Sequence, residues 1–393
     1  MQGKDIVITG LQAWEIEIGS NCKNIAVEFS KNNRVLYVNP PVDRFTAFRK
    51  KIKKSKTKVI EDRLIEVKKN LWVLYPQNRI ESINQLPFDL LFDILNKRNN
   101  RIIANEIEEA LKFLKFKNFV QFCDSDMFRS FYLKDFLKPS IYIYYTRDNL
   151  LAVDYWKRQG KRIEPLHMKK ADLVVANSTY LAKLASYHNP NSYFVGQGCD
   201  LSAFRTENAN TIPMDISEIP KPIIGYIGAL KTLRLNIDTI QYIAESKPEW
   251  SVVLIGPEDD DFKASKLHNL SNVRFLGSKD EKMLPNYLMK FDVAINPQIV
   301  NEVTIGNYPR KIDEYLAMGK PVVATQTEAM DYFKEYTSLA NTNAEWVECI
   351  DMELKRDNEH LQKSRMVFAS QHTWEKNVYE IYEQISKTKR NEY

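Results

Sequence analysis

The chain has 393 residues, a length that suggests two or three domains. Its composition, with 44% apolar and 27% charged residues, is ordinary for a soluble globular protein. The 56 lysines and arginines nearly balance the 51 aspartates and glutamates. This balance excludes a broadly basic nucleic-acid coat and an acidic disordered chain.

Strand-like and helical segments alternate along the first half of the chain. We expect strands at 5–10, 34–38, 71–75, 118–122, 140–145 and 172–178. Between them we expect helices at 21–31, 85–97, 101–115, 127–137, 148–170 and 179–187. Short, continuously apolar strands that alternate with helices indicate a parallel sheet covered on both faces.

The alternation restarts after a proline-containing stretch around 205–220, whose composition is typical of a linker. Further strands are expected at 222–228, 250–256, 272–277, 292–297 and 321–325, and helices at 235–247, 280–290, 309–318, 343–357 and 374–387. We therefore predict an α/β protein with two Rossmann-like, doubly wound domains that face each other across a cleft. The predicted boundaries are 1–205, 206–372 and a C-terminal helix, 373–393, that packs back on the first domain.

The cysteine spacing and the N-terminal residues indicate in which cellular compartment the protein is expected. Cys22, Cys123, Cys199 and Cys349 are too far apart for a zinc motif, so free buried thiols are expected. The N-terminus has no long apolar core of a signal peptide, and no run approaches the roughly 18 apolar residues of a membrane span. We expect a cytoplasmic protein.

The most informative stretch is 307–325, which reads NYPRKIDEYLAMGKPVVAT. It predicts a short helix with Pro309 in its first turn and Gly319 at its C-terminal cap, followed by a buried strand. Arg310 and Lys311 would lie at the helix start, where free backbone N–H groups already favour an anion. A carboxylate one turn later, at Glu314, would accept two hydrogen bonds from a ribose diol. The alternative is a capped amphipathic helix whose charges are merely solvated.

This stretch resembles the nucleotide-sugar motif of GT-B glycosyltransferases, in the large retaining family 4-like group and close to its teichuronic-acid subgroup. Four further segments resemble the same family in the same order: VLYVNPP at 35–41, KADLVVANS at 170–178, GQGCD at 196–200 with Phe204 after it, and IGYIGAL at 224–230. Together they span nearly the whole chain.

The resemblance implies a donor site in the second domain. Glu314 would hold the ribose, Arg310 and Lys311 would approach the diphosphate, and Lys231 or Arg234 would neutralise the leaving diphosphate. The implied donor-binding residues are Gly228, Ala229, Lys231, Arg234, Gly306, Asn307, Arg310, Lys311 and Glu314. The family reaches its charge balance without a metal, so no metal and no cofactor are expected, and the substrate would be a UDP- or GDP-sugar.

One position departs from the family pattern. The family often carries a first glutamate eight residues before the ribose-binding one, and this chain has Gly306 there. That glutamate usually contacts the donor sugar. Its absence keeps open a catalytically silent subunit that binds a glycan or a partner enzyme.

Residues of the first domain would serve the acceptor. Asp148 follows a predicted strand and is expected in acceptor binding or proton handling, with capping of the next helix as the alternative. With Lys231 and Arg310 it completes the expected catalytic set. Gly19 and Ser20 match a loop that faces the donor phosphate or the acceptor.

Three further patterns are expected to be structural. Asp124-Ser-Asp126 is a DxD triplet of the kind that holds a metal in other glycosyltransferases, but the triplet is short and lies in the wrong half. The acidic run at 258–261 is expected to be a solvated loop, and His167 to be a surface histidine.

Residues 44–58 carry eight lysines and arginines and no acidic residue. Aromatic residues at helical spacing among these cations favour contact with an anionic membrane over a solvated charge run. The expected contact residues are Phe45, Phe48, Arg49, Lys50, Lys51, Lys53 and Lys54.

The sequence thus predicts a glycosyltransferase that moves a sugar from a nucleotide diphosphate sugar to a glycan or lipid-linked acceptor of a surface polysaccharide. Retention of configuration follows from the resemblance. Expected partners are the donor, the acceptor and an anionic membrane surface on the cytoplasmic face, and no nucleic acid. A nucleotide-sugar epimerase of the same fold is a further alternative.

Overall fold

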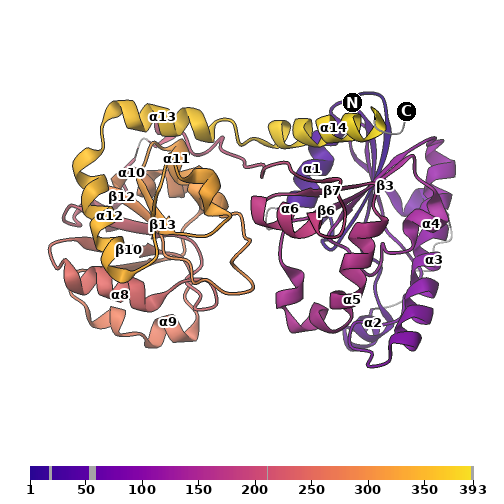
Figure 1. Ribbon diagram of the computed structural model, residues 1–393, viewed down its shortest axis with the longest axis horizontal. Coiled ribbons are helices and arrows are strands. Elements are labelled where there is room, and N and C mark those ends of the chain that lie inside the picture. The colour runs from indigo at the N-terminus through magenta and orange to yellow at the C-terminus, as the bar shows by residue number, and fades with distance from the viewer. Residues whose placement is uncertain (17–19, 53–58, 210, 391–393) are drawn as a thin grey trace. The chain divides into compact units, whose positions relative to one another are not determined.

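The computed structural model describes residues 1–16, 20–52, 59–209 and 211–390 (Figure 1). The chain forms two compact units. Unit 1 contains Met1–Gly196 and Asn377–Tyr393, and unit 2 contains Gln197–Lys376.

Unit 1 is built on an eight-stranded sheet with the order β3-β4-β2-β1-β5-β6-β7-β8. Its strands are β1 (Asp5–Gly10), β2 (Arg34–Val38), β3 (Leu64–Lys68), β4 (Leu71–Leu74), β5 (Val120–Asp124), β6 (Ile141–Thr146), β7 (Leu173–Ala176) and β8 (Ser192–Phe194). Strand β3 runs antiparallel to β4, and the other neighbours are parallel. β1, β5 and β6 are buried along their whole length, as central strands covered on both faces should be.

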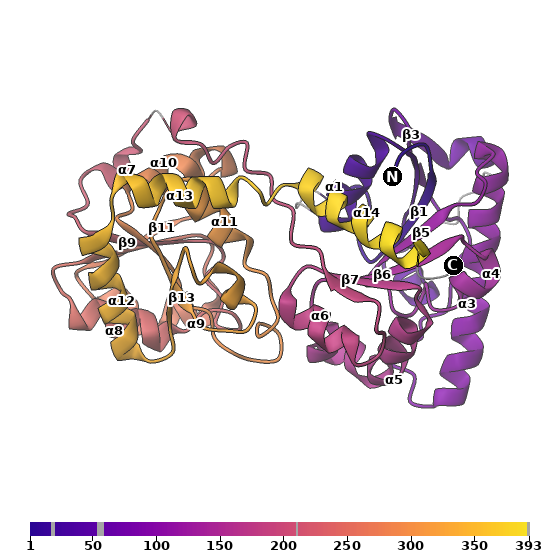
Figure 2. The same ribbon diagram turned by 45° about the horizontal axis from the view of Figure 1, so that its top comes forward.

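Helices cover both faces of this sheet. They are α1 (Asn21–Ser30), α2 (Arg44–Arg49), α3 (Asp89–Leu114), α4 (Leu133–Leu137), α5 (Asp154–Lys170), α6 (Thr179–Ser186) and α14 (Trp374–Arg390), with short 3-10 turns η1 (Ile60–Asp62) and η2 (Leu150–Ala152). Ile103 and Ile107 of α3 pack with Val7 of β1 on one face. On the other, Phe29 of α1 contacts Phe122 and stacks on Tyr382 of α14, and α1 and α14 lie side by side in Figures 1 and 2.

Unit 2 is built on a six-stranded sheet with the order β11-β10-β9-β12-β13-β14, in which neighbours are parallel. Its strands are β9 (Ile223–Ile227), β10 (Ser251–Ile255), β11 (Val273–Gly277), β12 (Val293–Asn296), β13 (Val322–Thr325) and β14 (Ser338–Ala340). The prediction of two mostly parallel α/β sheets is confirmed.

The helices of unit 2 divide between the two faces of its sheet. They are α7 (Met214–Ser217), α8 (Ile237–Ser246), α9 (Asp260–Ala264), α10 (Leu284–Lys290), α11 (Arg310–Ala317), α12 (Asn343–Arg356) and α13 (Glu359–Ala369), with the 3-10 turns η3 (Thr206–Asn208), η4 (Lys266–Asn269), η5 (Glu281–Met283) and η6 (Met330–Phe333). One core cluster packs α8, α9 and α12 on the sheet, and another packs α10, α11 and α13 on its opposite face. Phe204 and Ile216 are buried in the second cluster, so the stretch with linker-like composition packs as part of unit 2.

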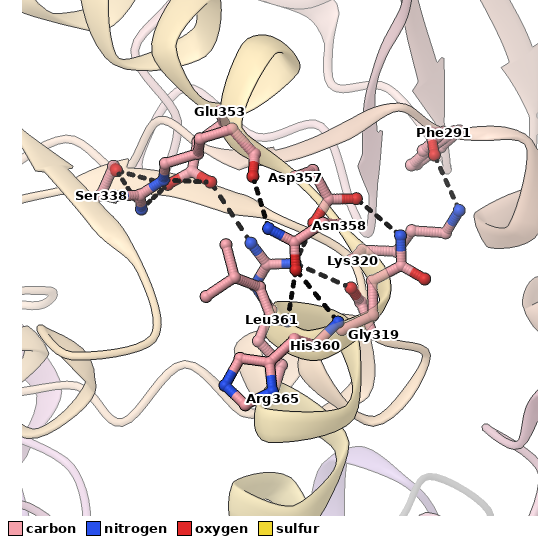
Figure 3. Close-up of polar contacts among 12 residues, drawn as sticks. Phe291, Gly319, Lys320, Ser338, Glu353, Asp357, Asn358, His360, Leu361 and Arg365 are labelled. Atoms are coloured by element: carbon pink, nitrogen blue, oxygen red, sulfur yellow. Dashed lines mark hydrogen bonds and ion pairs between the residues drawn. The ribbon is translucent and has the colours of Figure 1, made fainter.

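A buried ionic network fixes the C-terminal end of α11 (Figure 3). The Arg365 guanidinium donates to the carbonyl oxygen of Gly319 at 3.1 Å and pairs with Asp357 at 2.5 Å and Glu353 at 3.4 Å. Lys320 donates to the carbonyl oxygen of Phe291 at 2.9 Å, just before β12. Because charges this deep are costly unless paired, the network holds the helix in one place relative to α12, α13 and the sheet.

The strand orders locate the ligand-binding edge of each sheet. In unit 1 the chain runs from β1 to β2 on one side and continues with β5 on the other. In unit 2, β9 is likewise flanked by β10 and β12. Doubly wound sheets bind ligands at the carboxyl ends of the strands where the order reverses. These ends lie at Gly10 and Asp124 in unit 1, and at Ile227 and Asn296 in unit 2.

Candidate functional site

Two glycines lie at the carboxyl ends of the strands of unit 2 where the strand order reverses. Gly228 follows β9 with φ +146°, and its N–H donates to the carbonyl oxygen of Ile255 at 2.8 Å. A Cβ on Gly228 would lie 2.8 Å from the phenolic oxygen of Tyr226 and 3.1 Å from Nζ of Lys311. A Cβ on Gly256 would lie 2.0 Å from the carbonyl oxygen of Gly228. Side chains are therefore excluded here, and backbone stays accessible beside a lysine ammonium.

Helix α11 is fixed to this edge by Tyr315. Its phenolic oxygen accepts a hydrogen bond from the N–H of Ile227 at 2.9 Å and donates to the carbonyl oxygen of the same residue at 3.2 Å. One turn earlier, Lys311 donates to Tyr226 at 2.9 Å. The start of the helix thus lies at the carboxyl end of β9, where its free N–H groups favour an anion.

The charged side chains at the start of α11 have few protein partners. Within the described part of the chain, neither Arg310 nor Glu314 takes part in a hydrogen bond or ion pair, and both are half-buried. Burial raises the pKa of Glu314 to about 7, although Arg310 and Lys311 oppose the shift. Half-buried charges without partners are costly, and a polar ligand would supply the missing hydrogen bonds.

The preceding residue of the same helix behaves differently. Asp313 is fully buried, and its two carboxylate oxygens bond to Nδ1 of His372 at 2.6 Å and to Sγ of Cys199 at 3.2 Å. Sequence reasoning assigned no role to Asp313 or His372, and it named Cys199 only as a buried free thiol in the 196–200 segment. Asp313 joins the helix to the 196–200 segment and to the chain after α13, so its role is to position α11.

The loop after β9 carries Ala229, Lys231 and Arg234, whose side chains are exposed. Asp259 holds this loop by accepting hydrogen bonds from the N–H of Thr232 at 2.8 Å and from its hydroxyl at 3.0 Å. The acidic run at 258–261 therefore has a structural partner in this loop and in α9, which Asp259 caps.

A second loop, 297–309, brings Gly306 and Asn307 to the same edge. Asn301 joins the two loops, because its amide donates to the carbonyl oxygen of Leu233 at 2.9 Å and its oxygen accepts from Val303 at 2.9 Å. Gly306 is buried and Asn307 half-buried, immediately before α11. The structure thus brings together at one sheet edge all nine residues that the sequence assigned to the donor.

In unit 1, where the strand order reverses between β1 and β5, one arginine forms ion pairs with two aspartates. Arg147 donates to Asp124 at 2.9 Å and to Asp148 at 2.8 Å. Asp124 is fully buried, whereas 41% of the Asp148 side chain is exposed. The residues that precede η2 and α5 are Asn149 and Val153, so Asp148 is not the N-cap of either helix.

The remaining predictions in unit 1 have varied outcomes. Ser20 is the N-cap of α1 and accepts a hydrogen bond from the N–H of Lys23 at 3.4 Å. Gly19 lies outside the described residues. Both acids of the DxD triplet are bound by arginines, Asp124 by Arg147 and Asp126 by Arg129.

The expectation of a surface histidine at position 167 is wrong. His167 is fully buried and shares a 2.6 Å hydrogen bond with Tyr142. The expectation of buried free thiols holds for Cys22, Cys123 and Cys199, while Cys349 is half-buried.

The start of the basic segment forms α2, capped by Asp43. Phe45 and Phe48 are 62% and 84% exposed, and Arg49, Lys50 and Lys51 are exposed beside them. Lys53 and Lys54 lie outside the described residues. Among the helices in the described ranges, none is both long enough and apolar enough to cross a bilayer.

Comparison with known proteins agrees with this geometry. Residues 221–350 match the family described as Glycosyl transferases group 1. A 188-residue stretch is 29% identical to TuaH of Bacillus subtilis (strain 168), to which a glycosyltransferase role in teichuronic acid biosynthesis is ascribed. That match covers 46% of this chain, and the chain spans about half of the length of this curated relative (46%).

Solved structures match over almost the whole chain. HepE of Anabaena in complex with UDP aligns with a TM-score of 0.63 at 14% identity, covering 98% of this chain and 100% of that one. The UDP-forming trehalose-phosphate synthase of Burkholderia vietnamiensis aligns with a TM-score of 0.71 at 8% identity, covering 99% and 98%. Sucrose-phosphate synthase from Thermosynechococcus elongatus gives 0.65 at 14% identity, covering 98% and 99%. The fold is that of the GT-B glycosyltransferases.

Proposed function

We propose that this protein of GT-B fold is a glycosyltransferase that moves a sugar from a nucleotide diphosphate sugar to a glycan or lipid-linked acceptor in surface polysaccharide biosynthesis. One observation carries the proposal. The sheet edge of unit 2 gathers glycines without room for a Cβ, a helix N-terminus and charged side chains that lack protein partners.

In this proposal different residues of α11 bind different parts of the donor. The ribose hydroxyls donate to the Glu314 carboxylate, and the diphosphate lies at Gly228 beside Lys311 and Arg310. Lys231 and Arg234 approach from the loop after β9. These cations and the helix N-terminus stabilise the negative charge that builds on the departing diphosphate, which is the main electrostatic demand of the reaction.

The proposal extends to features that rest on the family resemblance. They are retention of anomeric configuration and a donor site that works without a metal, with positive charge supplied by arginine and lysine. HepE, a solved relative by fold, was crystallised with UDP and with UDP-glucose, so UDP-sugars are the first donors to test.

Asp148 is proposed to bind or deprotonate the acceptor. Its salt bridge to Arg147, which is itself held by buried Asp124, fixes its position while leaving part of its carboxylate exposed.

In the same proposal, α2 and the cations that follow it attract an anionic membrane on the cytoplasmic side, because each such cation contributes about 1 kcal/mol near an anionic surface.

A second candidate is a catalytically silent subunit of the same fold. It is favoured by Gly306, since this position lies in the loop directly before α11 and provides no carboxylate for the donor sugar.

Sugar release from a panel of labelled UDP- and GDP-sugars tests the two candidates. Wild type is compared with Arg310→Ala and with Lys334→Ala, which removes an exposed cation elsewhere in unit 2. The proposal predicts that wild type releases sugar from one donor class. Arg310→Ala should lose this release, and Lys334→Ala should keep it. Tight nucleotide binding without release from any donor would favour the silent subunit. An epimerase would instead convert the donor sugar without releasing it.

A further inference from the structure

Glu314 lies between two anchored residues of α11, Asp313 and Tyr315. The Tyr315 phenol bonds to the backbone at the end of β9, which fixes the helix to the sheet. The Asp313 carboxylate bonds to Nδ1 of His372 at 2.6 Å and to Sγ of Cys199 at 3.2 Å. A helix of eight residues has little stability of its own, so these two anchors set the direction in which Glu314 points.

The imidazole of His372 is itself held in one orientation. It is buried, and its Nε2 shares a 2.9 Å hydrogen bond with the hydroxyl of Tyr332. Its ring packs edge-on against Phe333 and Phe368, with ring centroids 6.1 Å and 4.5 Å away. An ionised carboxylate only accepts hydrogen bonds, so Nδ1 donates to Asp313. The imidazole therefore presents this donor to α11 at a fixed place.

Both chain segments that connect the two units meet at this anchor. The chain enters unit 2 at Gln197 and leaves it after Lys376. Close to these points, the N–H of Cys199 donates to the carbonyl oxygen of His372 at 2.9 Å. The two side chains that hold Asp313 thus come one from each connecting segment.

The Asp313 contact differs in kind from the apolar contacts that hold α11. Ile312 and Leu316 already pack the helix on the sheet. The Asp313 contact adds direction, because a hydrogen bond depends on angle and distance whereas apolar packing tolerates small shifts. A directional anchor suits a helix whose next side chain must be aimed at a ligand.

We propose that His372 is a positioning residue of the donor site: through Asp313 it fixes α11 so that the Glu314 carboxylate meets the nucleotide, and through the same contact nucleotide binding orders the two connecting segments. The inference rests on the proposed function, because it takes Glu314 as a donor-binding residue. His372 itself does not touch the nucleotide, so its effect on binding passes through α11.

Calorimetric titration of the full chain tests the inference, with whichever of UDP, GDP, dTDP and ADP binds wild type as the probe. His372→Leu removes the N–H donor and should weaken nucleotide affinity roughly tenfold. His372→Asn should recover most of this loss, because the asparagine amide carries an N–H donor as far from the main chain as Nδ1.

Thr239→Val is the matched control and should bind the nucleotide as wild type does. It removes a buried hydroxyl whose 3.0 Å hydrogen bond to Asn343 joins α8 to α12, on the opposite face of the sheet from α11. Equal losses of affinity in Thr239→Val and His372→Leu would show that any weakening of unit 2 impairs binding, and would overturn the inference.

A double variant separates positioning from a general structural role. If His372 acts on the ligand through Glu314, His372→Leu should cost clearly less affinity in the Glu314→Gln background than in wild type. Losses that simply add would overturn the inference, as would wild-type affinity in His372→Leu or a loss that His372→Asn does not recover.

Hydrogen exchange of backbone amides gives a result on wild type alone, even if His372→Leu does not fold. Nucleotide binding should slow exchange in residues 197–200 and 370–376 and leave α12 unchanged. Slowing that is confined to α11 and the neighbouring loops of the donor edge would overturn the inference.

The same titrations separate this inference from the proposed function. Nucleotide binding that depends on Glu314 but not on His372 would overturn the inference alone. Folded wild type that binds none of the four nucleotides would contradict the proposed function, and the inference with it.

Discussion

Nζ of Lys311 donates a hydrogen bond to the phenolic oxygen of Tyr226 at 2.9 Å and lies 4.7 Å from the centre of the tyrosine ring. The contact joins the start of α11 to the end of β9. It holds the ammonium against Gly228, where a diphosphate would meet both the cation and the free backbone N–H groups at the start of α11.

Gly228→Ala should therefore weaken nucleotide diphosphate binding strongly while unit 2 stays folded. The new Cβ would lie 2.8 Å from the Tyr226 oxygen and would also be strained at φ +146°. We expect affinity to fall roughly a hundredfold, since the Lys311 ammonium would be pushed away from the bound diphosphate. Gly3→Ala is the control, because Gly3 also has a positive φ but open space around it. Calorimetry that gives equal affinities for wild type and Gly228→Ala would contradict the assignment.

Nucleotide-sugar affinity should depend on pH through Glu314. Burial raises the pKa of this carboxyl to about 7, and the ribose hydroxyls require the ionised form as acceptor. Affinity should rise about tenfold per pH unit up to pH 7 and level off above it. Glu314→Gln should show no such slope. Titration with an intact nucleotide sugar, whose diphosphate does not ionise in this range, gives the comparison between pH 5.5 and 8.5. The same slope in both proteins would exclude Glu314 as the titrating group.

Asp148→Asn should slow sugar transfer without weakening donor binding. If Asp148 handles the acceptor proton, turnover should fall roughly 10²–10³-fold, as for other general bases. Asp154→Asn, at an exposed carboxylate six residues later, should leave turnover unchanged. The measurement is kcat with saturating donor and acceptor alongside the donor Kd. Loss of donor affinity in Asp148→Asn would instead assign the residue to the donor.

Glu164 should make the folded state less stable as pH rises. It is buried in α5, accepts a hydrogen bond from Tyr144 at 2.9 Å, and has its pKa raised to about 7 by burial. Between pH 4.5 and 7 the unfolded chain ionises this carboxyl while the folded state keeps it protonated, so stability falls as pH rises, by about 3 kcal/mol in all.

Denaturant unfolding of Glu164→Gln from pH 5 to 8 checks this expectation. The variant should lose about half of the wild-type slope, because the pKa of Glu314 is also raised to about 7, and it should exceed wild type in stability at pH 8. Glu314 titrates in the same range, so a smaller slope should persist in Glu164→Gln and vanish in the double variant with Glu314→Gln. An unchanged slope in Glu164→Gln would show that Glu164 titrates normally.

The strands could be predicted well from sequence because most of them are short, fully buried apolar runs. β2 was predicted with its exact bounds, Arg34–Val38, whereas β3 was missed. β3 lies at the sheet edge, its charged residues face solvent, and it runs antiparallel to β4, so it lacks the continuous apolar pattern.

One helix was predicted as two for a specific reason. The polar pair Asn99-Asn100 interrupts the apolar periodicity of α3. In the fold, however, both side chains are buried and bonded, Asn99 to the backbone of Glu81 and Asn100 to the carbonyl oxygens of Asn96 and Phe128. Such partners come from distant segments and leave no periodic signal in the sequence.

In the candidate site, too, some residues could be predicted from the sequence and others could not. Arg310, Lys311 and Glu314 could be found because one short motif places them on one helix end. The Asp313–His372 contact could not be predicted, because the two residues are 59 positions apart and His372 belongs to no motif. The cavity of unit 1 that Phe45, Phe128, Tyr155 and Trp156 line was not predicted either, because six separate segments of the chain build its wall.

The central claim is that α11 and Gly228 form a nucleotide-diphosphate site, and thermal unfolding tests it most directly. Wild type and Glu314→Ala are melted with UDP, GDP, dTDP or ADP, each with and without EDTA. The account predicts that one nucleotide raises the melting temperature of wild type equally with and without EDTA, and that Glu314→Ala loses this shift. If no nucleotide shifts wild type, or if Glu314→Ala keeps the full shift, the donor site is not where this account places it.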